Sequence, residues 1–493
     1  MNKYKLLIIG LILGIAGFTH FYRIDHTYVF QNDEGRDALI AYRMLDTGKP
    51  ILLGPETSVG NMYLGPFYYY LMVPALFLSN LDPVGPAMMV GFFGVGTTFL
   101  LIFLGKKYQH VSAGIVAGLF YALSPVMVYY SRSSWNPNVI SFFIVLMLYI
   151  YPLSKKWQTF AFGVLTGIIF QLHYVALIIP VLLLIFDLYQ KIKVKDYQTL
   201  VTNLVLIFIG FLFASLPFWL FESRHGFINS KAFMTYLMAK SGSGDLGYPS
   251  YLNRLITNAQ LLTAGIFGSS TLLINPISLN LFLLIVIIFV LYIVFSGGIL
   301  SYLTIFSLII VSVLKEQIHI HYLGFLFPIV SLIVGLSLFS KNWISRVLTA
   351  IFLIVIIGPF YQSLSYNLGQ LDSTQPRRAR ETAAYITAQA TGRSYNVVNA
   401  SSGSSATILY YLAISPNPPK SAMQPLLFVI CENALCSNDI ETNPQLFLNG
   451  PSHPAVINYL GYTPSLDQRE YRQIVKNEWV TYDVHVATVQ QEP

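Results

Sequence analysis

The stretch VGPAMMVGFFGVGTTFLLIFL, residues 84–104, decides the fold class of this chain. It contains no charged side chain, and a helix needs about 20 apolar residues to cross the hydrocarbon core of a membrane. Similar apolar runs lie to either side of it, at about 6–21, 111–129, 138–153, 158–172, 174–189, 199–221, 277–296, 299–314, 320–340 and 344–362. The pattern predicts a polytopic α-helical membrane protein with about 11 transmembrane helices. The first run follows Lys3 and Lys5 without a convincing cleavage site behind it, which indicates an uncleaved anchor.

The composition excludes a soluble protein of this size. Charged residues make up 10% of the 493 residues, against about 25% in typical soluble domains. The hydrophobic fraction is 55%, and the mean hydropathy is +0.59. The net charge of +7 belongs to the membrane part, because the tail from Ser363 onward holds more acidic than basic residues. Such an excess is typical of cytoplasmic membrane loops, and nothing in the sequence indicates a nucleic-acid partner.

The basic residues of the loops predict the orientation of the chain. They fall on alternate loops, on the side of Lys3 and Lys5, if the short apolar segment Gly65–Leu78 does not cross the membrane. These residues are Lys106, Lys107, Lys155, Lys156, Lys191, Lys193, Lys195, Lys341 and Arg346. We therefore expect a multi-pass plasma-membrane protein with a cytoplasmic N-terminus and an interfacial helix at Gly65–Leu78. The outside segments are then 22–83, 130–137, 222–276, 315–319, the hinge Gln171–Tyr174 and the tail.

The chain divides into two predicted domains. Residues 1–362 form a membrane domain whose first outside loop is 22–83, and residues 363–493 form a small extracytoplasmic domain. Short strand-like pieces such as Leu426–Ile430 indicate mixed α/β structure in this tail. Cys431 and Cys436 both lie there, and a disulfide and two unpaired thiols are both open.

The first outside loop contains an acidic helix start, QNDEGRDALIAYRMLDTG, residues 31–48. Ala38, Ala41, Tyr42 and Leu45 recur with helical spacing. Asn32 or Asp33 is expected to cap this helix, and Gly48 to terminate it. The carboxylates of Asp33, Glu34 and Asp37 then crowd its first turn. They serve either as caps that complement the helix dipole or as reactive groups beside a membrane.

Further polar and aromatic residues gather at the predicted outer ends of the spans. Each is read either as an interface anchor or solvated cap, or as part of a substrate-binding wall. The candidates for binding are Tyr68, Tyr69, Arg132, Asn136, His173, Tyr174, Lys240, Arg254, His319, His321 and Tyr322. Most other charges of loop 222–276, Glu222 among them, are expected to be solvated, while one or two basic groups hold a phosphate.

These motifs resemble the GT-C class of membrane glycosyltransferases, in particular the protein O-mannosyltransferase and aminoarabinose transferase families. The resemblance covers residues 1–362 and rests on four motifs: Asp33-Glu34 followed by a helix that ends at Gly48, Gly65-Pro66-Phe67-Tyr68-Tyr69, Ser131-Arg132, and His321-Tyr322. Two departures stand out. Asn136 and Asn138 lie where relatives often carry an aspartate, and His321 replaces the arginine of a late Arg-Tyr pair.

The resemblance implies transfer of a sugar from a polyprenyl-phosphate carrier to a lipid, glycan or protein acceptor outside the cytoplasm, with inversion. Asp33 is then the general base, and Glu34 orients the acceptor, assists or binds a metal. Arg36 and Asp37 line the substrate site, and the basic and imidazole groups named above hold the phosphate. No metal ligand is assigned, and a divalent metal ion and a metal-free mechanism are both open.

A polytopic transporter or a lipid-linked-sugar flippase is the alternative. Such proteins usually place ionisable residues at the membrane midplane, often in repeated halves. The spans here are almost free of acidic residues, and no internal repeat is visible. The sequence therefore favours the enzyme.

Overall fold

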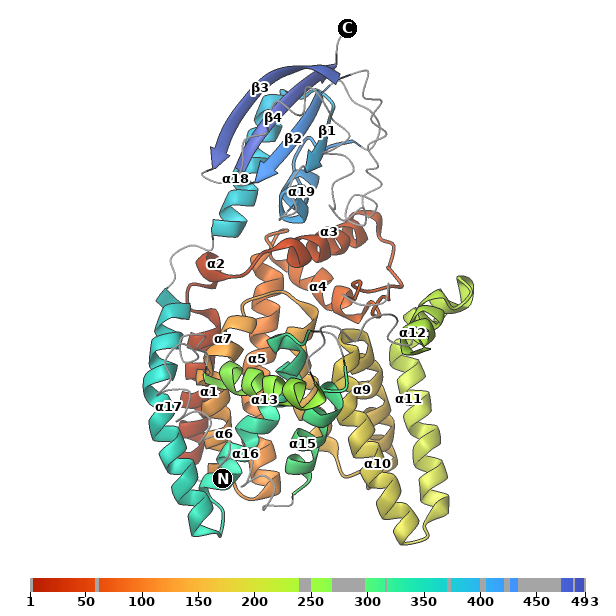
Figure 1. Ribbon diagram of the computed structural model, residues 1–493, viewed down its shortest axis with the longest axis vertical. Helices are drawn as coiled ribbons and strands as arrows, with labels where there is room; N and C mark the ends of the chain where they lie inside the picture. Colours follow the sequence, from red (N-terminus) through yellow and green to blue (C-terminus); the bar gives the residue numbers. More distant parts are fainter. Residues whose placement is uncertain are drawn as a thin grey trace. The chain divides into compact units, whose positions relative to one another are not determined.

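The computed structural model describes residues 3–57, 62–238, 250–267, 298–314, 317–369, 374–399, 405–420, 426–432, 471–481 and 484–491 (Figure 1). The chain forms two compact units. We call the first, Met1–Ile24, Ile51–Leu71 and Ala87–Gln370, the helical unit. The second, Asp25–Pro50, Met72–Pro86 and Leu371–Pro493, is the α/β unit.

The helical unit consists of α-helices and short 3₁₀ helices. In chain order they are α1 (Lys3–Phe21), α5 (Val84–Tyr108), α6 (Val111–Leu123), α7 (Pro125–Tyr130), η1 (Asn136–Val139), α8 (Ile140–Ile150), α9 (Lys156–Leu172), η2 (Tyr174–Leu177), α10 (Ile178–Lys193), α11 (Tyr197–Arg224), α12 (Ile228–Met238), α13 (Tyr251–Phe267), α15 (Ile299–Val311), η4 (Ile320–Leu326), α16 (Phe327–Leu338) and α17 (Trp343–Gly369). Within the described ranges, six helices are long and apolar enough to cross a membrane, and shorter apolar helices accompany them. The protein is a polytopic α-helical membrane protein, as the sequence predicts.

Several predicted spans are interrupted. The run 111–129 breaks at Ser124, where Pro125 starts the short helix α7. The runs at 174–189 and 320–340 begin as 3₁₀ turns before they become α-helical. The run 277–296 lies outside the described residues.

Among the helices in the predicted outside loops, α4 and α13 bear on the predicted membrane topology. The helix α4 (Phe67–Leu78) has 12 residues, which is about 18 Å of helix and well short of a roughly 30 Å hydrocarbon core. Its length agrees with the expected interfacial helix. The amphipathic α13 lies in loop 222–276, where the sequence analysis places no helix.

Glycines let the helices of the helical unit approach closely. A Cβ atom at Gly163 of α9 would meet the backbone of Ile207 in α11, and one at Gly210 of α11 would meet Phe160 in α9. The same holds for Gly335 of α16 against α6. Because lipid tails are as apolar as the helices, close backbone packing of this kind stabilises helix pairs in membranes.

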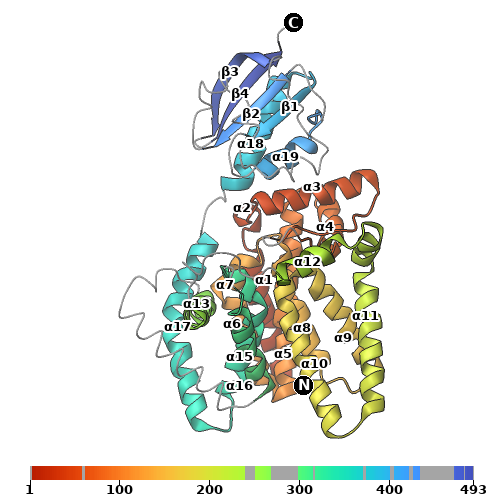
Figure 2. The same cartoon turned by 45° about the vertical axis from the view of Figure 1, so that its right-hand side comes forward.

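The α/β unit combines a four-stranded sheet with helices. Its elements are α3 (Asn32–Thr47), α18 (Thr374–Ala390), β1 (Tyr395–Asn399), α19 (Ser405–Ala413), β2 (Leu426–Glu432), β3 (Tyr471–Thr481) and β4 (Val484–Gln491), with α2 (Ile24–Thr27) at its border. The strand order is β1-β2-β4-β3, and Figure 2 shows the strands side by side with α18 and α19 next to the sheet.

The strand pairing explains the position of α19. Strands β1 and β2 are parallel, with Tyr395 opposite Leu426, while β4 is antiparallel to β2 and β3. A parallel pair needs a crossover connection, and α19 lies in the segment between β1 and β2. The predicted strand Leu426–Ile430 is confirmed. Cys436 lies outside the described residues, so the structure decides neither for the disulfide with Cys431 nor for two unpaired thiols.

Candidate functional site

The acidic helix start forms the first turn of α3. Its N-cap residue is Gln31, not Asn32 or Asp33, so that expectation was wrong. The Glu34 carboxylate accepts a hydrogen bond from the Gln31 backbone N–H at 3.0 Å, which satisfies one donor at the helix end. Gly48 ends the helix with a φ of 65°, a left-handed conformation that glycine adopts without strain. The predicted stop is confirmed.

Arg36 lies between two of the carboxylates. Its Nη1 is 2.8 Å from Asp33 Oδ1, and its Nη2 is 2.9 Å from Asp37 Oδ1. The side chain of Asp37 is fully buried, whereas that of Asp33 is 44% exposed. A carboxylate at this depth needs a cationic partner, and Arg36 supplies it for Asp37.

The two acids of the Asp-Glu pair thus have different surroundings. Glu34 is 4% exposed and is engaged with the helix terminus. Asp33 carries a salt bridge on one side and remains accessible to solvent on the other. Of the two predicted catalytic groups, only Asp33 is accessible to solvent.

In the helical unit, the predicted histidines come together. The ring of His321 lies 4.3 Å from Trp135, 5.7 Å from His319 and 6.4 Å from His173, measured between centroids. Tyr322 lies 4.9 Å from His173. We call these five residues the imidazole cluster. Burial lowers the pKa of His173 to about 4, so its imidazole is neutral at physiological pH and offers a hydrogen bond rather than a charge.

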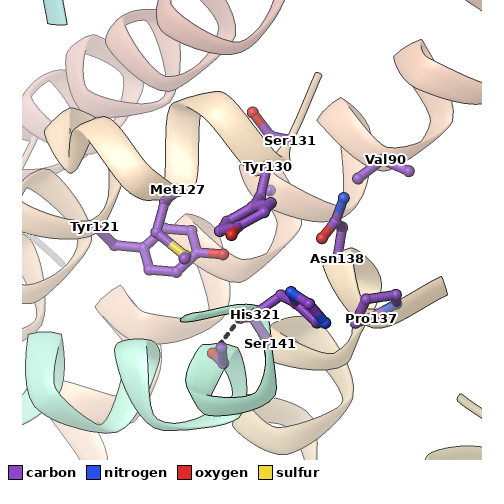
Figure 3. Close-up of a pocket in the computed structure, with 11 residues that line it drawn as sticks. Val90, Tyr121, Met127, Tyr130, Ser131, Pro137, Asn138, Ser141 and His321 are labelled. Carbon is purple, nitrogen blue, oxygen red and sulfur yellow. Dashed lines mark hydrogen bonds between the residues drawn. The ribbon is translucent and has the colours of Figure 1, made fainter. Parts of the chain in front are cut away.

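A small cavity adjoins this cluster (Figure 3). It has about 20 Å³ of space, enough for about one water molecule and too little for a sugar. Beside it, Ser141 Oγ donates a hydrogen bond to the Gly324 carbonyl at 3.1 Å, which joins α8 to η4. The cavity is lined by Val90, Gly94, Tyr121, Met127, Tyr130, Ser131, Pro137, Asn138, Ser141, His321 and Gly324.

Arg132 and Asn136 are buried and bonded to helix ends. The Arg132 Nη2 donates to the carbonyls of Thr19, at 2.8 Å, and Tyr22, at 2.9 Å, at the C-terminal end of α1. Burial lowers its pKa to about 10, which leaves the guanidinium protonated at neutral pH and suited to a helix C-terminus. Asn136 Nδ2 donates to the Leu172 carbonyl at the end of α9. In this arrangement Arg132 links its loop to the end of α1, and Asn136 links η1 to the end of α9.

The other predicted binding residues have contacts of their own. Tyr68 and Tyr69 are buried. The Tyr174 hydroxyl donates to the Tyr63 carbonyl at 2.5 Å. Arg254 Nε donates to the Ser312 carbonyl at 3.0 Å. Lys240 lies outside the described residues.

Sequence reasoning missed a buried acid at the end of α11. Glu222 was expected to be solvated, but it is completely buried. Its carboxylate accepts hydrogen bonds from the backbone N–H groups of Asn229 (3.0 Å) and Ser230 (2.8 Å) at the start of α12. Asn229 Oδ1 in turn accepts from the Tyr63 N–H at 2.9 Å. The sequence signal was that Glu222 directly follows the apolar run 199–221. At such a position a solvated charge and a residue that caps a helix end look alike in sequence.

The described residues contain no group of three His, Cys, Asp or Glu side chains placed to hold a metal ion. Some of the predicted residues form two groups, the acids around Arg36 in the α/β unit and the imidazole cluster in the helical unit. Chemically, the first offers an accessible carboxylate, and the second offers imidazole groups beside aromatic rings.

No family model and no curated protein matches the sequence. Solved structures do match. ArnT from Cupriavidus metallidurans bound to undecaprenyl phosphate aligns with a TM-score of 0.58 and 13% identity, over 98% of both chains. The chain has an ArnT-like GT-C fold. The apo form of the same protein gives a TM-score of 0.58 and 12% identity, over 98% of this chain and 97% of that one.

The GT-C resemblance predicted from the sequence is thus confirmed at the level of the fold. The Archaeoglobus fulgidus oligosaccharyltransferase in complex with Zn and sulfate is also similar, with a TM-score of 0.48 and 14% identity, over 76% of this chain and 55% of that one. The ArnT alignment extends through the C-terminal segment, which the sequence resemblance did not cover.

Proposed function

We propose that the protein is a membrane glycosyltransferase that moves a sugar from a polyprenyl-phosphate carrier to an acceptor. The observation that carries this proposal is the alignment over 98% of both chains with ArnT bound to undecaprenyl phosphate. The orientation predicted from the basic loops, with a cytoplasmic N-terminus and an extracytoplasmic C-terminal domain, belongs to the same proposal.

One accessible carboxylate fits this chemistry. A glycosyl phosphate already carries a good leaving group, so a general acid is dispensable, whereas a glycosidase needs two carboxylates. The enzyme has to deprotonate the acceptor hydroxyl and stabilise the departing phosphate. We assign the first task to Asp33, because it is exposed while Glu34 is engaged with the N-terminus of α3. Direct attack on the anomeric carbon then inverts its configuration.

The second task needs donors for phosphate oxygens. The imidazole cluster supplies ring N–H groups, and Arg254 and Lys240 supply positive charge from loop 222–276. Arg132 is a weaker candidate, since its Nη2 already donates to two backbone carbonyls. Lipid, glycan and protein acceptors fit these residues equally well.

The decisive experiment follows the carrier. Purified protein in detergent receives a mixed pool of labelled polyprenyl-phospho-sugars, and the release of free polyprenyl phosphate is measured. We expect release by the wild type and a loss of about 10²–10⁴-fold in Asp33→Asn, the range typical of a general base. The matched control is Asp46→Asn, an exposed acid at the other end of α3, which should keep wild-type activity.

Two results would contradict the proposal. Equal activity of Asp33→Asn and Asp46→Asn would remove Asp33 from the chemistry. Movement of an intact glycolipid across vesicle membranes, without release of carrier phosphate, would replace the enzyme by a flippase.

A further inference from the structure

Gly35 brings the backbone of α3 against the backbone of α19. A Cβ atom at this position would lie 2.5 Å from the backbone nitrogen of Thr407 and 2.7 Å from the carbonyl carbon of Ala406. Real Cβ atoms do not approach backbone atoms so closely. A glycine inside a helix lowers stability relative to alanine. Here the close approach of α19 explains why a glycine occupies position 35. Figure 1 shows both helices.

A hydrogen bond fixes the register of this contact. Asn32 Oδ1 accepts from the backbone N–H of Ala406 at 3.3 Å. This N–H belongs to the first turn of α19, where helix donors have no partner within the helix. The residue expected to cap its own helix therefore caps the helix that packs against it.

Two tyrosines of α19 contact the residue Phe30 before α3, and one of them also contacts the connection after α4. The rings of Tyr410 and Tyr411 each lie 5.9 Å from Phe30, just before α3. The Tyr410 hydroxyl donates to the Leu81 carbonyl at 2.6 Å, in the connection that follows α4. The Tyr28 and Tyr411 hydroxyls are 3.4 Å apart. Burial raises the pKa of Tyr28 and Tyr410, so both hydroxyls stay protonated.

We propose that α19 of the C-terminal segment positions the general base, with Gly35 and Asn32 as positioning residues for Asp33. This inference rests on the proposed function. Residues 33 and 35 are about 200° apart around a helix, so α19 covers one side of α3 and leaves the opposite side to substrate. The observed burial agrees, since Gly35 is buried and Asp33 is 44% exposed.

The test is Gly35→Ala in the full-length protein. The new methyl group must move about 1 Å to reach an ordinary contact distance from the Thr407 backbone, which tilts or shifts the first turn of α3. A displacement of about 1 Å at a catalytic group costs on the order of 10²-fold. We expect kcat to fall by that factor, while the KM for the polyprenyl-phospho-sugar stays within about threefold. The matched control is Gly358→Ala in α17, where a Cβ atom meets nothing within 4 Å.

A second pair of variants guards against simple misfolding. Asn32→Ala removes the acceptor for the Ala406 N–H and should lower kcat, whereas Asn32→Asp keeps an acceptor oxygen and should restore most of it. A purely structural contact would lower thermal stability in Gly35→Ala and Asn32→Ala without the separation of kcat from KM.

Hydrogen exchange of the α3 amides provides a readout that does not need activity. Gly35→Ala should increase exchange in α3 relative to Gly358→Ala. Wild-type kcat together with unchanged exchange would overturn the inference. If the wild type releases no polyprenyl phosphate from any donor, the proposed function fails. Hydrogen exchange alone then decides whether α19 holds α3 in place. Unchanged exchange in Gly35→Ala would again refute the inference.

Discussion

Replacement of Arg36 by methionine should destabilise the protein strongly, because Asp37 depends on it for charge compensation. The Arg36 Nη2 lies 2.9 Å from Asp37 Oδ1, and the two side chains are 14% and 0% exposed. Removing one partner of a buried ion pair typically costs about 3–5 kcal/mol, since the other charge stays buried without compensation. The bond to the half-exposed Asp33 adds only about 0.2–1 kcal/mol.

The assay is thermal unfolding of the purified protein in one detergent. For a unit of this size, 1 kcal/mol corresponds to roughly 2–4 °C, so Arg36→Met should lower the melting temperature by roughly 6–20 °C. Asp33→Asn removes only the exposed pair and should lower it by no more than about 4 °C. The two variants thus separate the stabilising acid from the proposed catalytic one.

A double variant isolates the pair. Arg36→Met with Asp37→Leu replaces both charges by apolar groups, and such replacements of buried pairs are often neutral. The double variant should therefore melt closer to the wild type than Arg36→Met does. If it melts no higher, or if Arg36→Met is as stable as Asp33→Asn, the reasoning about the buried charge is wrong.

Two further predictions concern the helical unit. The pKa of His173 is lowered to about 4 from an unfolded value of about 6.5, so the unfolded state binds more protons between these pH values. The melting temperature should therefore fall as the pH is lowered from about 6.5 to about 4. This fall should be less steep in His173→Gln. Glu222→Ala leaves the N–H groups of Asn229 and Ser230 without their acceptor, at about 1–3 kcal/mol each, and should lower the melting temperature by several degrees; an unchanged value would mean that water replaces the carboxylate.

The sequence predicted the features that local patterns determine. Long apolar runs marked the helices of the helical unit, and the spacing of Ala38, Ala41 and Leu45 marked α3. Breaks inside spans were harder to predict, although Ser124 and Pro125 gave a local signal. The amphipathic α13 was missed because its apolar face is too narrow for the criterion that finds membrane spans.

The structure brings some of the candidate residues together, but their contacts were not predicted. The sequence placed His173, His319 and His321 at the outer ends of the spans, and their rings lie close together. The cap of α3 was predicted wrongly because the Asn32 side chain is drawn to Ala406, more than 370 positions away in the chain. Contacts between residues so far apart in the chain leave no local sequence pattern. Gly35 within α3 was the one sequence feature that could have indicated this contact.

The three consecutive residues Asp33, Glu34 and Gly35 make different contacts within one helical turn. Successive residues point about 100° apart around a helix, so each faces a different environment. Glu34 turns back to the helix terminus, Gly35 faces α19, and Asp33 faces solvent beside Arg36. The accessible acid is thus followed by two residues that are engaged with the helix terminus and with α19. In this Asp-Glu-Gly sequence the glycine allows the backbone of α19 to pack against the first turn of α3, and by our proposal this contact fixes the direction of the first acid.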